Sequence, residues 1–493
     1  MASEIRVNKI ENRSGLGTVT FADTGVDLAG IVTATTFSGS GASLTNLPAA
    51  NVTGTLPAIS GANLTNLPAA NLTGALPAIS GANLTGIAAT DNVRTGILDV
   101  AGIATFRNDV NIGAAVTISE SGIEASGIGI TVANINGGQI GGRRNLIING
   151  AMMVAQRGTS STSTGYNTVD RFKGEFSGTD ESPTFAQVDV SSGTTPYSLG
   201  FRKAYKVTNG NQTSGAGAAD YVGVEQRIEA QNIATSGWNY TSPSSFVTFS
   251  FWVKSSVAQN FYGYLFTEDG AERLYSFETG SLTADTWTKI TKTIPGNSIV
   301  QVNNDNGFGL QIQIWPFLGT NYTASGSTLN QWKVWDGAAR FPDMTTTWYT
   351  TNDATWETTG WQLEVGSQAT PFEHRSFGDE LINCQRYFQV LGGSNGTYDT
   401  MSTGACASST IAYVPHRLVT SMRATPSFTL LGAASDFMYT RDGGDHNPSA
   451  IVYDQAGKNM IAVKMTGTSL NQDDATRLFN INTNGGYLMD AEI

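Results

Sequence analysis

Large apolar residues return every 20 positions in the first part of the chain, and this pattern predicts an extended, repeated fold. Residues 41–60 read GASLTNLPAANVTGTLPAIS, and residues 61–80 read GANLTNLPAANLTGALPAIS. Each copy contains two prolines, which exclude a continuous helix. Glycine does not occur at every third position, so a collagen helix is excluded as well. What remains is a series of short extended segments joined by turns.

A single chain cannot bury the apolar side chains of this repeat. Each copy has five medium-sized apolar residues and no aromatic one. Their burial, at about 1.5–3 kcal/mol for each side chain, does not offset backbone ordering at about 1–2 kcal/mol for each residue. Identical chains that wind around a common axis remove this deficit, because each Leu or Ile then meets its symmetry mates and the strand edges pair between chains. We therefore expect residues 28–90, which contain no charged residue or histidine, to form a shaft of intertwined chains. Three is the usual number of chains in fibrous β-shafts, so we expect a homotrimer. A disordered low-complexity linker is the alternative.

The pattern changes at about residue 91 and again at about residue 145. Over 91–144 apolar residues alternate at period two between glycine-rich breaks, which predicts further extended β-shaft. All nine tryptophans lie from Trp238 to Trp361, which is typical of a large core. Apolar runs in this part are separated by turns at intervals of about a dozen residues. We therefore expect a jelly roll or β-sandwich over 145–375, and a mainly β protein.

One helix and a last β-rich module follow. Ser376 can cap a helix whose first turn carries Asp379 and Glu380, and two glycines follow its end. The pattern predicts a helix over 376–391. Residues 392–493 carry several short apolar runs, which predict a C-terminal β-sandwich tip.

Composition and charge exclude several classes of function. Charged residues make up only 14% of the chain, against about 25% in typical soluble domains. The net charge is −12 and there is no long cluster of Lys and Arg, so we expect no nucleic-acid partner. The sequence has no run of about 20 apolar residues, so it does not predict a membrane-spanning helix. The first residues have no apolar signal region, so we expect synthesis in the cytoplasm of the host.

The reactive residue types give no catalytic pattern. None of the three histidines, His374, His416 and His446, lies beside a Gly-x-Ser-x-Gly or cysteine-nucleophile motif. The two cysteines, Cys384 and Cys406, lack the spacing of a metal site and are expected to be reduced core residues. We therefore predict no catalytic residues, no metal and no cofactor.

Sugar binding requires aromatic faces for stacking and polar side chains for hydroxyl groups. An irregular, turn-rich segment over 330–352 is rich in aromatic residues. Our candidate ligand-binding residues are four of these: Trp332, Trp335, Trp348 and Tyr349. The alternative is that they are core or trimer-interface residues. The polar loop over 436–447 is a second candidate surface.

Two parts of the chain resemble a known family. Residues 1–40, with the opening MASEIRVNKI and the segment GIVTATTFSG at 30–39, resemble tail-fibre proteins of phages that infect marine cyanobacteria. Residues 145–390 resemble a common phage tail-fibre module. The shared motifs are NLIINGAM (145–152), VAQRG (154–158), DRF (170–172), SFWVKS (250–255), WQLEVGS (361–367), ATPFEHRS (369–376) and CQRYF (384–388).

The resemblance implies a virion protein, a homotrimer and a jelly-roll domain similar to carbohydrate-binding modules. We expect residues 1–27 to attach the fibre to the phage tail or an adaptor protein. The C-terminal modules would then bind a host cell-surface glycan or lipopolysaccharide, so that the fibre mediates host recognition and adsorption.

Two other functions stay open at this point. Hydrolysis of a polysaccharide requires only two carboxylates about 5–10 Å apart, so a polysaccharide-degrading tailspike is one alternative. Known phage depolymerases look like long parallel β-helices, which this chain does not resemble, and we expect no enzyme. A purely structural virion fibre without a receptor is the other alternative.

Overall fold

The computed structural model describes residues 9–11, 18–23, 25–36, 38–40, 45, 110–112, 116–119, 122–125, 143–393, 398–441 and 443–493. The chain divides into two compact units, Met1–Arg107 and Asn108–Ile493. The 20-residue repeats lie outside the described residues, apart from residue 45, and so does most of the predicted shaft over 28–90.

The first unit contains a small antiparallel sheet of three strands: β1 (Lys9–Glu11), β2 (Thr18–Ala22) and β3 (Gly25–Ala29). Several apolar side chains of this unit are exposed in the single chain, among them Ile10, Val26 and Leu28. A sheet is stable when it buries one apolar face against another layer. Within the described residues, no other strand or helix packs on this sheet.

The second unit begins with another three-stranded antiparallel sheet, β4 (Val110–Ile112), β5 (Val116–Ser119) and β6 (Gly122–Ala125). Val110 pairs with Ile118, and Ile118 pairs with Ile123. These strands lie in the segment over 91–144 for which the period-two pattern predicts extended β-structure.

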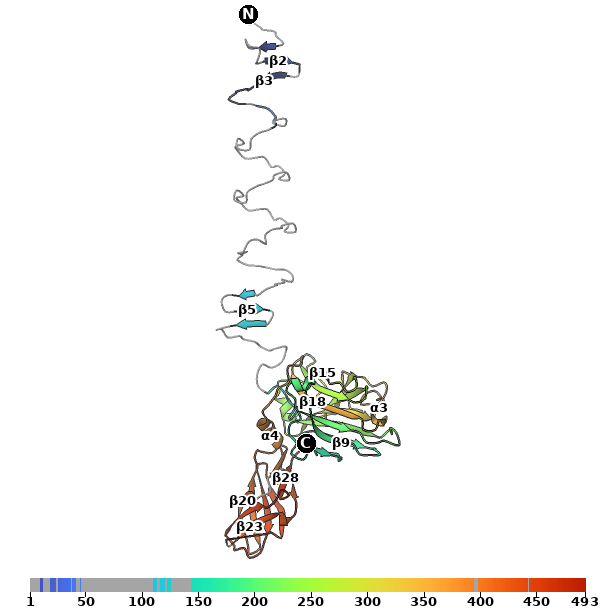
Figure 1. Ribbon diagram of the computed structural model, residues 1–493, viewed down its shortest axis with the longest axis vertical. Helices are drawn as coiled ribbons and strands as arrows, with labels where there is room; N and C mark the ends of the chain where they lie inside the picture. Colours follow the sequence, from blue (N-terminus) through green and yellow to red (C-terminus); the bar gives the residue numbers. More distant parts are fainter. Residues whose placement is uncertain are drawn as a thin grey trace. The chain divides into compact units, whose positions relative to one another are not determined.

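A sandwich of two six-stranded antiparallel sheets follows (Figure 1). One sheet, here called the β12 sheet, has the order β15-β12-β18-β10-β9-β7. Its strands are β7 (Ser160–Ser161), β9 (Thr184–Asp189), β10 (Lys203–Thr208), β12 (Phe246–Ser255), β15 (Thr288–Pro295) and β18 (Thr355–Val365).

The other sheet, here called the β16 sheet, has the order β17-β14-β13-β16-β11-β8. Its strands are β8 (Lys173–Ser177), β11 (Tyr221–Glu229), β13 (Asn260–Thr267), β14 (Arg273–Ser281), β16 (Phe308–Leu318) and β17 (Trp332–Val334). Three short helices lie in the connections: α1 (Thr195–Ser198), α2 (Ala230–Ala234) and α3 (Thr347–Thr350).

The core of the sandwich lies between the two sheets and is rich in aromatic rings. Successive side chains of a strand point to opposite faces, so alternate residues of each strand enter the core. Phe249 and Phe251 of β12 enter it together with Trp361 of β18, and all three are fully buried. The Phe249 ring meets the Trp361 ring edge to face, with centroids 5.3 Å apart, a favourable geometry for aromatic pairs.

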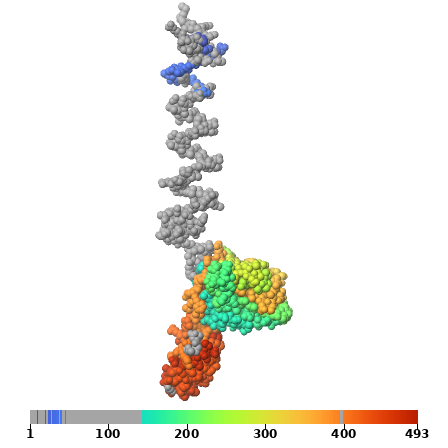
Figure 2. Space-filling view, viewed as in Figure 1, coloured from blue at the N-terminus to red at the C-terminus, as the bar shows by residue number. Residues whose placement is uncertain are grey.

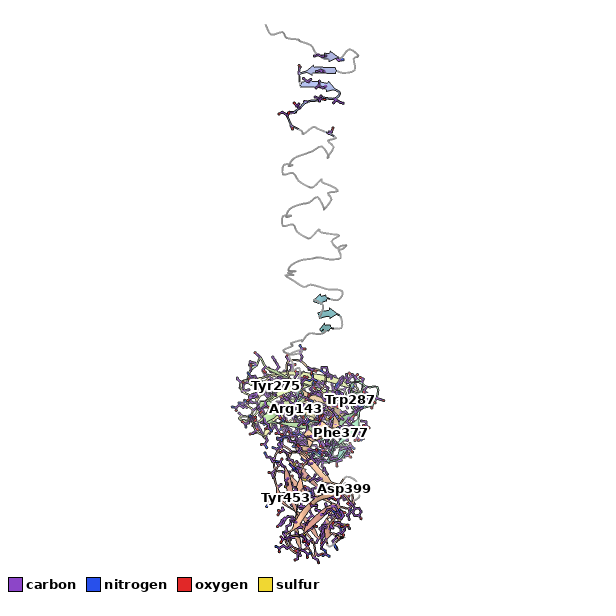
Figure 3. The ribbon with its side chains drawn as sticks, turned by 90° about the vertical axis from the view of Figure 1, so that its left-hand side faces the viewer. Arg143, Tyr275, Trp287, Phe377, Asp399 and Tyr453 are labelled. Carbon is purple, nitrogen blue, oxygen red and sulfur yellow. The ribbon has the colours of Figure 1, made fainter. Side chains whose placement is uncertain are left out.

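Helix α4 (Phe377–Gln385) lies in the segment over 376–391 for which the sequence predicts a helix. Ser376 is its N-cap, because the Ser376 hydroxyl accepts a hydrogen bond from the Asp379 backbone N–H at 3.1 Å. The helix is shorter than expected, because β19 (Phe388–Gly392) begins soon after it and pairs with the last strand of the chain. Phe377, labelled in Figure 3, is half-exposed at the start of α4.

The C-terminal tip is a second, smaller pair of sheets, with the orders β19-β28-β22 and β24-β23-β27-β20-β21-β26-β25. Figure 2 shows the sandwich residues in cyan to orange and the last part of the tip in red. The remaining elements are β20 (Thr400–Cys406), β21 (Ile411–Arg417), β22 (Ser427–Leu431), η6 (Ala434–Asp436), β23 (Phe437–Arg441), β24 (Gly444–His446), β25 (Ala450–Ala456), β26 (Met460–Thr466), β27 (Ala475–Asn480) and β28 (Gly486–Asp490).

The fold class predicted from the sequence, mainly β with a sandwich, is confirmed. The homotrimer stays a prediction. Cys384 and Cys406 are both buried and free, as expected for cysteines that pack as small apolar residues. Among the described residues, no helix is both long and apolar enough to span a membrane.

Buried charges connect the sandwich to the segment that leads into the tip. Glu229 at the end of β11 accepts hydrogen bonds from Arg386 Nε (2.7 Å) and Nη2 (2.8 Å) and from the Tyr387 hydroxyl (2.5 Å). Burial alone would raise the pKa of Glu229, but the hydrogen bonds from Arg386 and Tyr387 outweigh it and lower the pKa. Arg171 adds a cation–π contact, with its guanidinium 3.5 Å from the Tyr387 ring centroid.

We predict that Glu229→Gln lowers the free energy of unfolding by about 2–3 kcal/mol, because it leaves Arg386 without its anion at a site that is only partly open to water. Chemical denaturation measures this loss. Asp189→Asn is the matched control, because the Lys203–Asp189 pair (2.6 Å) is largely exposed and should contribute less than about 1 kcal/mol. An equal loss of unfolding free energy in the two variants would contradict a stabilising role for the Glu229–Arg386 ion pair.

Candidate functional site

A groove of about 380 Å³ lies on the face of the β16 sheet that points away from the sandwich core. Strands β8, β11, β13 and β16 supply its floor, and the segments around Tyr322, Trp335 and Arg340 supply further walls. Successive residues of a strand point to opposite faces, so the same strands supply residues to both the core and the groove. On β16, Leu310 and Ile312 enter the core, whereas Gln311 and Gln313 line the groove.

Amide side chains hold the floor of the groove in a fixed arrangement. Gln311 Nε2 donates hydrogen bonds to Glu225 and, at 2.9 Å, to Gln313 Oε1. Gln313 Nε2 donates to Glu175 Oε2 at 2.8 Å, and the Tyr264 hydroxyl donates to Gln313 Oε1. A connected network of this kind presents donors and acceptors in defined positions.

Glu225 is the most deeply buried charged group of the groove. Burial and the neighbouring Glu175 carboxylate raise the pKa of Glu225 to about 7, although Arg227 and Lys173 act in the opposite direction. Arg227 Nε lies 3.1 Å from Glu225 Oε1 and Lys173 Nζ lies 3.5 Å from it, so both cations form ion pairs with this carboxylate.

Aromatic rings form one wall of the groove. The Tyr221 ring meets the rings of Trp315 and Tyr322 edge to face, with centroids 5.6 and 5.9 Å apart. Gly223 lets Trp315 lie close to the backbone of β11, because a Cβ at this position would come within 2.6 Å of the indole ring. Rings held in this way provide apolar faces beside the polar floor.

The Arg340 guanidinium lies among three of these rings. Its Cζ atom is 4.9 Å from the centroids of Tyr322 and Trp335 and 5.7 Å from that of Trp315. Cation–π contacts of this kind hold a guanidinium in place without using its N–H groups. No hydrogen bond or ion pair to the guanidinium is found within the part of the chain that the structure describes, and Nε is buried. Buried N–H groups normally have hydrogen-bond partners. The N–H groups of Arg340 are therefore available to bind a ligand.

The structure places only one of the four predicted ligand-binding residues in this groove, Trp335. Trp348 and Tyr349 are completely buried in the sandwich core, where Tyr349 stacks on Phe317 with centroids 4.2 Å apart. Trp332 is also buried, and its indole N–H donates to the Pro295 carbonyl at 2.7 Å. A buried ring cannot stack on a sugar, so we replace these three candidates with the residues of the groove.

The second predicted surface, over 436–447, forms the hairpin of β23 and β24, and residue 442 lies outside the described residues. The Asp436 carboxylate at its start accepts hydrogen bonds from the Ala433 backbone N–H (2.7 Å) and from Asn482 Nδ2 (2.7 Å). These contacts stabilise the turn. A role for this surface in binding stays a prediction.

No family model matches the chain, and no curated protein matches it either. Among solved structures, the enzymatically active domain of tailspike protein 4 from bacteriophage CBA120 is 8% identical with a TM-score of 0.24, over 45% of this chain and 21% of that one. The N-terminal cellulose-binding domain of β-1,4-glucanase C from Cellulomonas fimi is 13% identical with a TM-score of 0.21, over 44% of this chain and 99% of that one.

A family 11 carbohydrate-binding module from Clostridium thermocellum, solved with a β-1,3-1,4-mixed-linked tetrasaccharide, is 11% identical with a TM-score of 0.20, over 44% of this chain and 98% of that one. Similarity at this level does not assign a function to the chain. The function has to be derived from the groove itself.

The pKa of Glu225 predicts how stability depends on pH. An unfolded chain releases this proton near pH 4.5, whereas the folded chain keeps it up to about pH 7. Because the folded state binds more protons in this interval, the Glu225 contribution to stability falls as the pH rises through it. We predict that Glu225→Gln lacks this fall. Denaturation of both proteins between pH 4 and 8 measures the difference.

Glu268→Gln is the control for this experiment, because Glu268 is an exposed carboxylate of the same groove. It should keep the pH dependence of the unaltered protein. The prediction is refuted if the stability of the unaltered protein and that of Glu225→Gln change with pH in the same way.

Proposed function

We propose that this chain is a trimeric phage tail fibre that attaches the virion to its host by binding a cell-surface glycan in the groove of the β16 sheet. The observation that carries the proposal is the combination of ring faces with a polar floor in one groove. Sugars have apolar ring faces that stack on aromatic side chains and hydroxyl groups that need both donors and acceptors. Trp335 and Tyr221 offer the rings, and the Gln311–Gln313 network and Arg340 offer the polar groups.

The charge of the groove favours uncharged sugars. Its lining contains the carboxyl groups of four glutamates and the guanidinium groups of two arginines. Like charges in close contact oppose binding, so an anionic polysaccharide would meet repulsion from the excess of carboxylates. A neutral glycan meets no such repulsion.

Trimerisation gives such a site its biological use. A single sugar site with a Kd near 1 mM provides only about −4 kcal/mol. Three linked copies raise the avidity by roughly 10²–10⁴ without new contacts. The exposed apolar residues of the β1–β3 sheet support assembly, because other chains can cover them. In this proposal residues 1–27 attach to the phage tail, the segment over 28–144 sets the reach of the fibre, and the C-terminal modules meet the cell.

The groove predicts which variants lose binding. Trp335→Ala should weaken binding of neutral oligosaccharides from a cyanobacterial envelope by about tenfold or more, because it removes a stacking face and one of the rings that hold Arg340. Calorimetry with the purified full chain measures the affinity. Trp287→Ala is the matched control: this half-buried ring lies just before β15 of the other sheet and does not line the groove, so its loss should leave the affinity unchanged.

The same experiment separates the alternatives. If the unaltered protein binds neither the oligosaccharides nor cells, a purely structural fibre is favoured and the proposal fails. Release of shorter oligosaccharides that Glu225→Gln abolishes would favour a polysaccharide-degrading tailspike, since a carboxyl group with a raised pKa next to a second carboxylate is the pair that glycoside hydrolysis uses.

The proposal also predicts the mass of the native particle. A chain of 52.0 kDa should give an assembly of about three times that mass, roughly 156 kDa, in native mass spectrometry. A folded particle with the mass of one chain would contradict the trimer, whatever the groove binds.

A further inference from the structure

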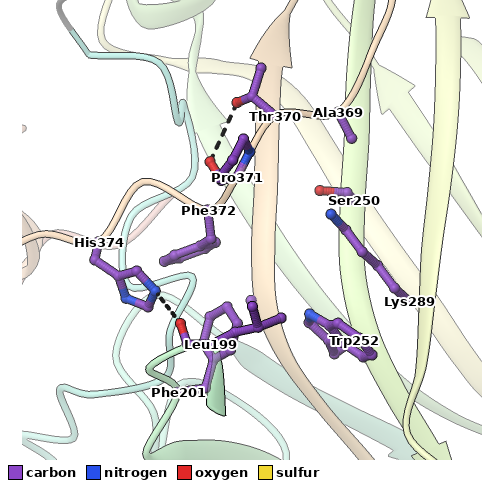
Figure 4. A pocket seen from close by; sticks show the side chains of 11 residues that line it. Leu199, Phe201, Ser250, Trp252, Lys289, Ala369, Thr370, Pro371, Phe372 and His374 are labelled. Carbon is purple, nitrogen blue, oxygen red and sulfur yellow. Dashed lines mark hydrogen bonds between the residues drawn. The ribbon is translucent and has the colours of Figure 1, made fainter. Parts of the chain in front are cut away.

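A second hollow, of about 410 Å³, lies on the outer face of the β12 sheet, on the opposite side of the sandwich from the groove. Figure 4 shows it from close by, with side chains from β12, β15 and the segment after β18. Its volume is within the range of about 300–1,000 Å³ that small-molecule sites occupy. We call it the Ser250 pocket.

A backbone irregularity opens the floor of this pocket. The pairing of β12 with β18 is interrupted between Ser250 and Trp252, and Gly360 of β18 lies there with a φ of +67°. A Cβ at residue 360 would come within 2.7 Å of the Phe201 ring and 3.2 Å of the Trp252 ring. The absence of a side chain at Gly360 therefore leaves space between two aromatic residues.

The walls are apolar and held in place. The ring centroids of Phe201 and Phe372 are 4.9 Å apart, edge to face, and the His374 ring lies 4.9 Å from Phe372. His374 Nε2 donates to the Leu199 carbonyl at 2.9 Å, which fixes the imidazole against these rings (Figure 4). Trp252 is half-buried, so part of its indole faces the hollow.

Two hydrogen-bond donors, Ser250 and Lys289, line one side of the pocket. Figure 4 shows the Lys289 ammonium group extending toward the Ser250 hydroxyl. Ser250 is 3% exposed, yet its hydroxyl has no hydrogen bond to any described residue, and Lys289 makes no ion pair with one. Lys289 is exposed and the Ser250 hydroxyl lines the pocket, so both donors can reach a ligand there. The Thr370 hydroxyl, by contrast, is already engaged with Glu364 Oε2 at 2.6 Å.

We propose that the Ser250 pocket binds a sugar that carries a carboxylate, of the hexuronate class. Lys289 and Ser250 donate to the carboxylate oxygens, which turns two unpaired donors into charge-assisted hydrogen bonds. The ring of the sugar lies against Trp252 and Phe372. The pocket thus complements the groove: one sandwich carries a site for uncharged sugars on one sheet and a site for acidic sugars on the other. Binding in the pocket does not depend on binding in the groove.

Sodium glucuronate and glucose are the probes that test the pocket, in calorimetry or saturation-transfer NMR with the full chain. Glucuronate should bind about tenfold more tightly than glucose, because only glucuronate offers a carboxylate to the two donors. Lys289→Gln should reduce the affinity for glucuronate to that for glucose. Lys292→Gln removes the same charge from the same strand outside the pocket and should leave the affinity unchanged.

Trp335→Ala alters the groove and should leave glucuronate binding unchanged. The experiment therefore distinguishes a wrong proposal for the groove from a wrong proposal for the pocket. The pocket proposal is overturned if glucuronate does not bind, if the two sugars bind equally, or if Lys292→Gln weakens binding as much as Lys289→Gln does.

Discussion

Each long strand of the sandwich has two faces with opposite requirements, and the rest of the structure depends on this constraint. The face that meets the other sheet must be apolar, because the core excludes water. The other face is free to carry polar and aromatic side chains. Strand β16 illustrates the division, with Leu310, Ile312 and Ile314 in the core and Gln311 and Gln313 between them in the groove. The packing of the two sheets thus fixes the positions of the side chains in the groove.

The two candidate sites use this constraint in different ways. In the groove, the neighbouring strands β8, β11, β16 and β13 bring their polar groups together, and hydrogen bonds join these groups through Gln313. In the Ser250 pocket, the ladder is interrupted at Gly360, and the interruption creates the space.

Much of the architecture could be predicted from local sequence, because it depends on local chemistry. The Ser376 cap acts on an amide three residues away, and the strands of the sandwich show the apolar alternation that predicts them. The groove was within reach of the same reasoning: the alternation of Leu, Gln, Ile, Gln and Ile over 310–314 indicates two amides on a face outside the core. The signal for the groove is this run of apolar residues with a polar residue at every second position.

The remaining parts depend on contacts between residues far apart in the sequence. Nothing in the segment over 330–352 distinguishes Trp335, which lines the groove, from Trp348, whose burial depends on packing between distant strands. The Ser250 pocket joins Phe201 and Phe372, and no local pattern indicates that these rings meet. The carboxyl pair of the groove is of the same kind, because Glu175 and Glu225 come together only when β8 pairs with β11.

The central claim is that the β16 sheet holds a sugar in its groove, and a crystal structure of the chain with a neutral envelope oligosaccharide tests it most directly. The account predicts a sugar ring against Trp335 or Tyr221, with hydroxyl groups within hydrogen-bond distance of Arg340 and of the amides joined to Gln313. An oligosaccharide bound on the C-terminal tip, beside a groove that contains only water, would contradict it.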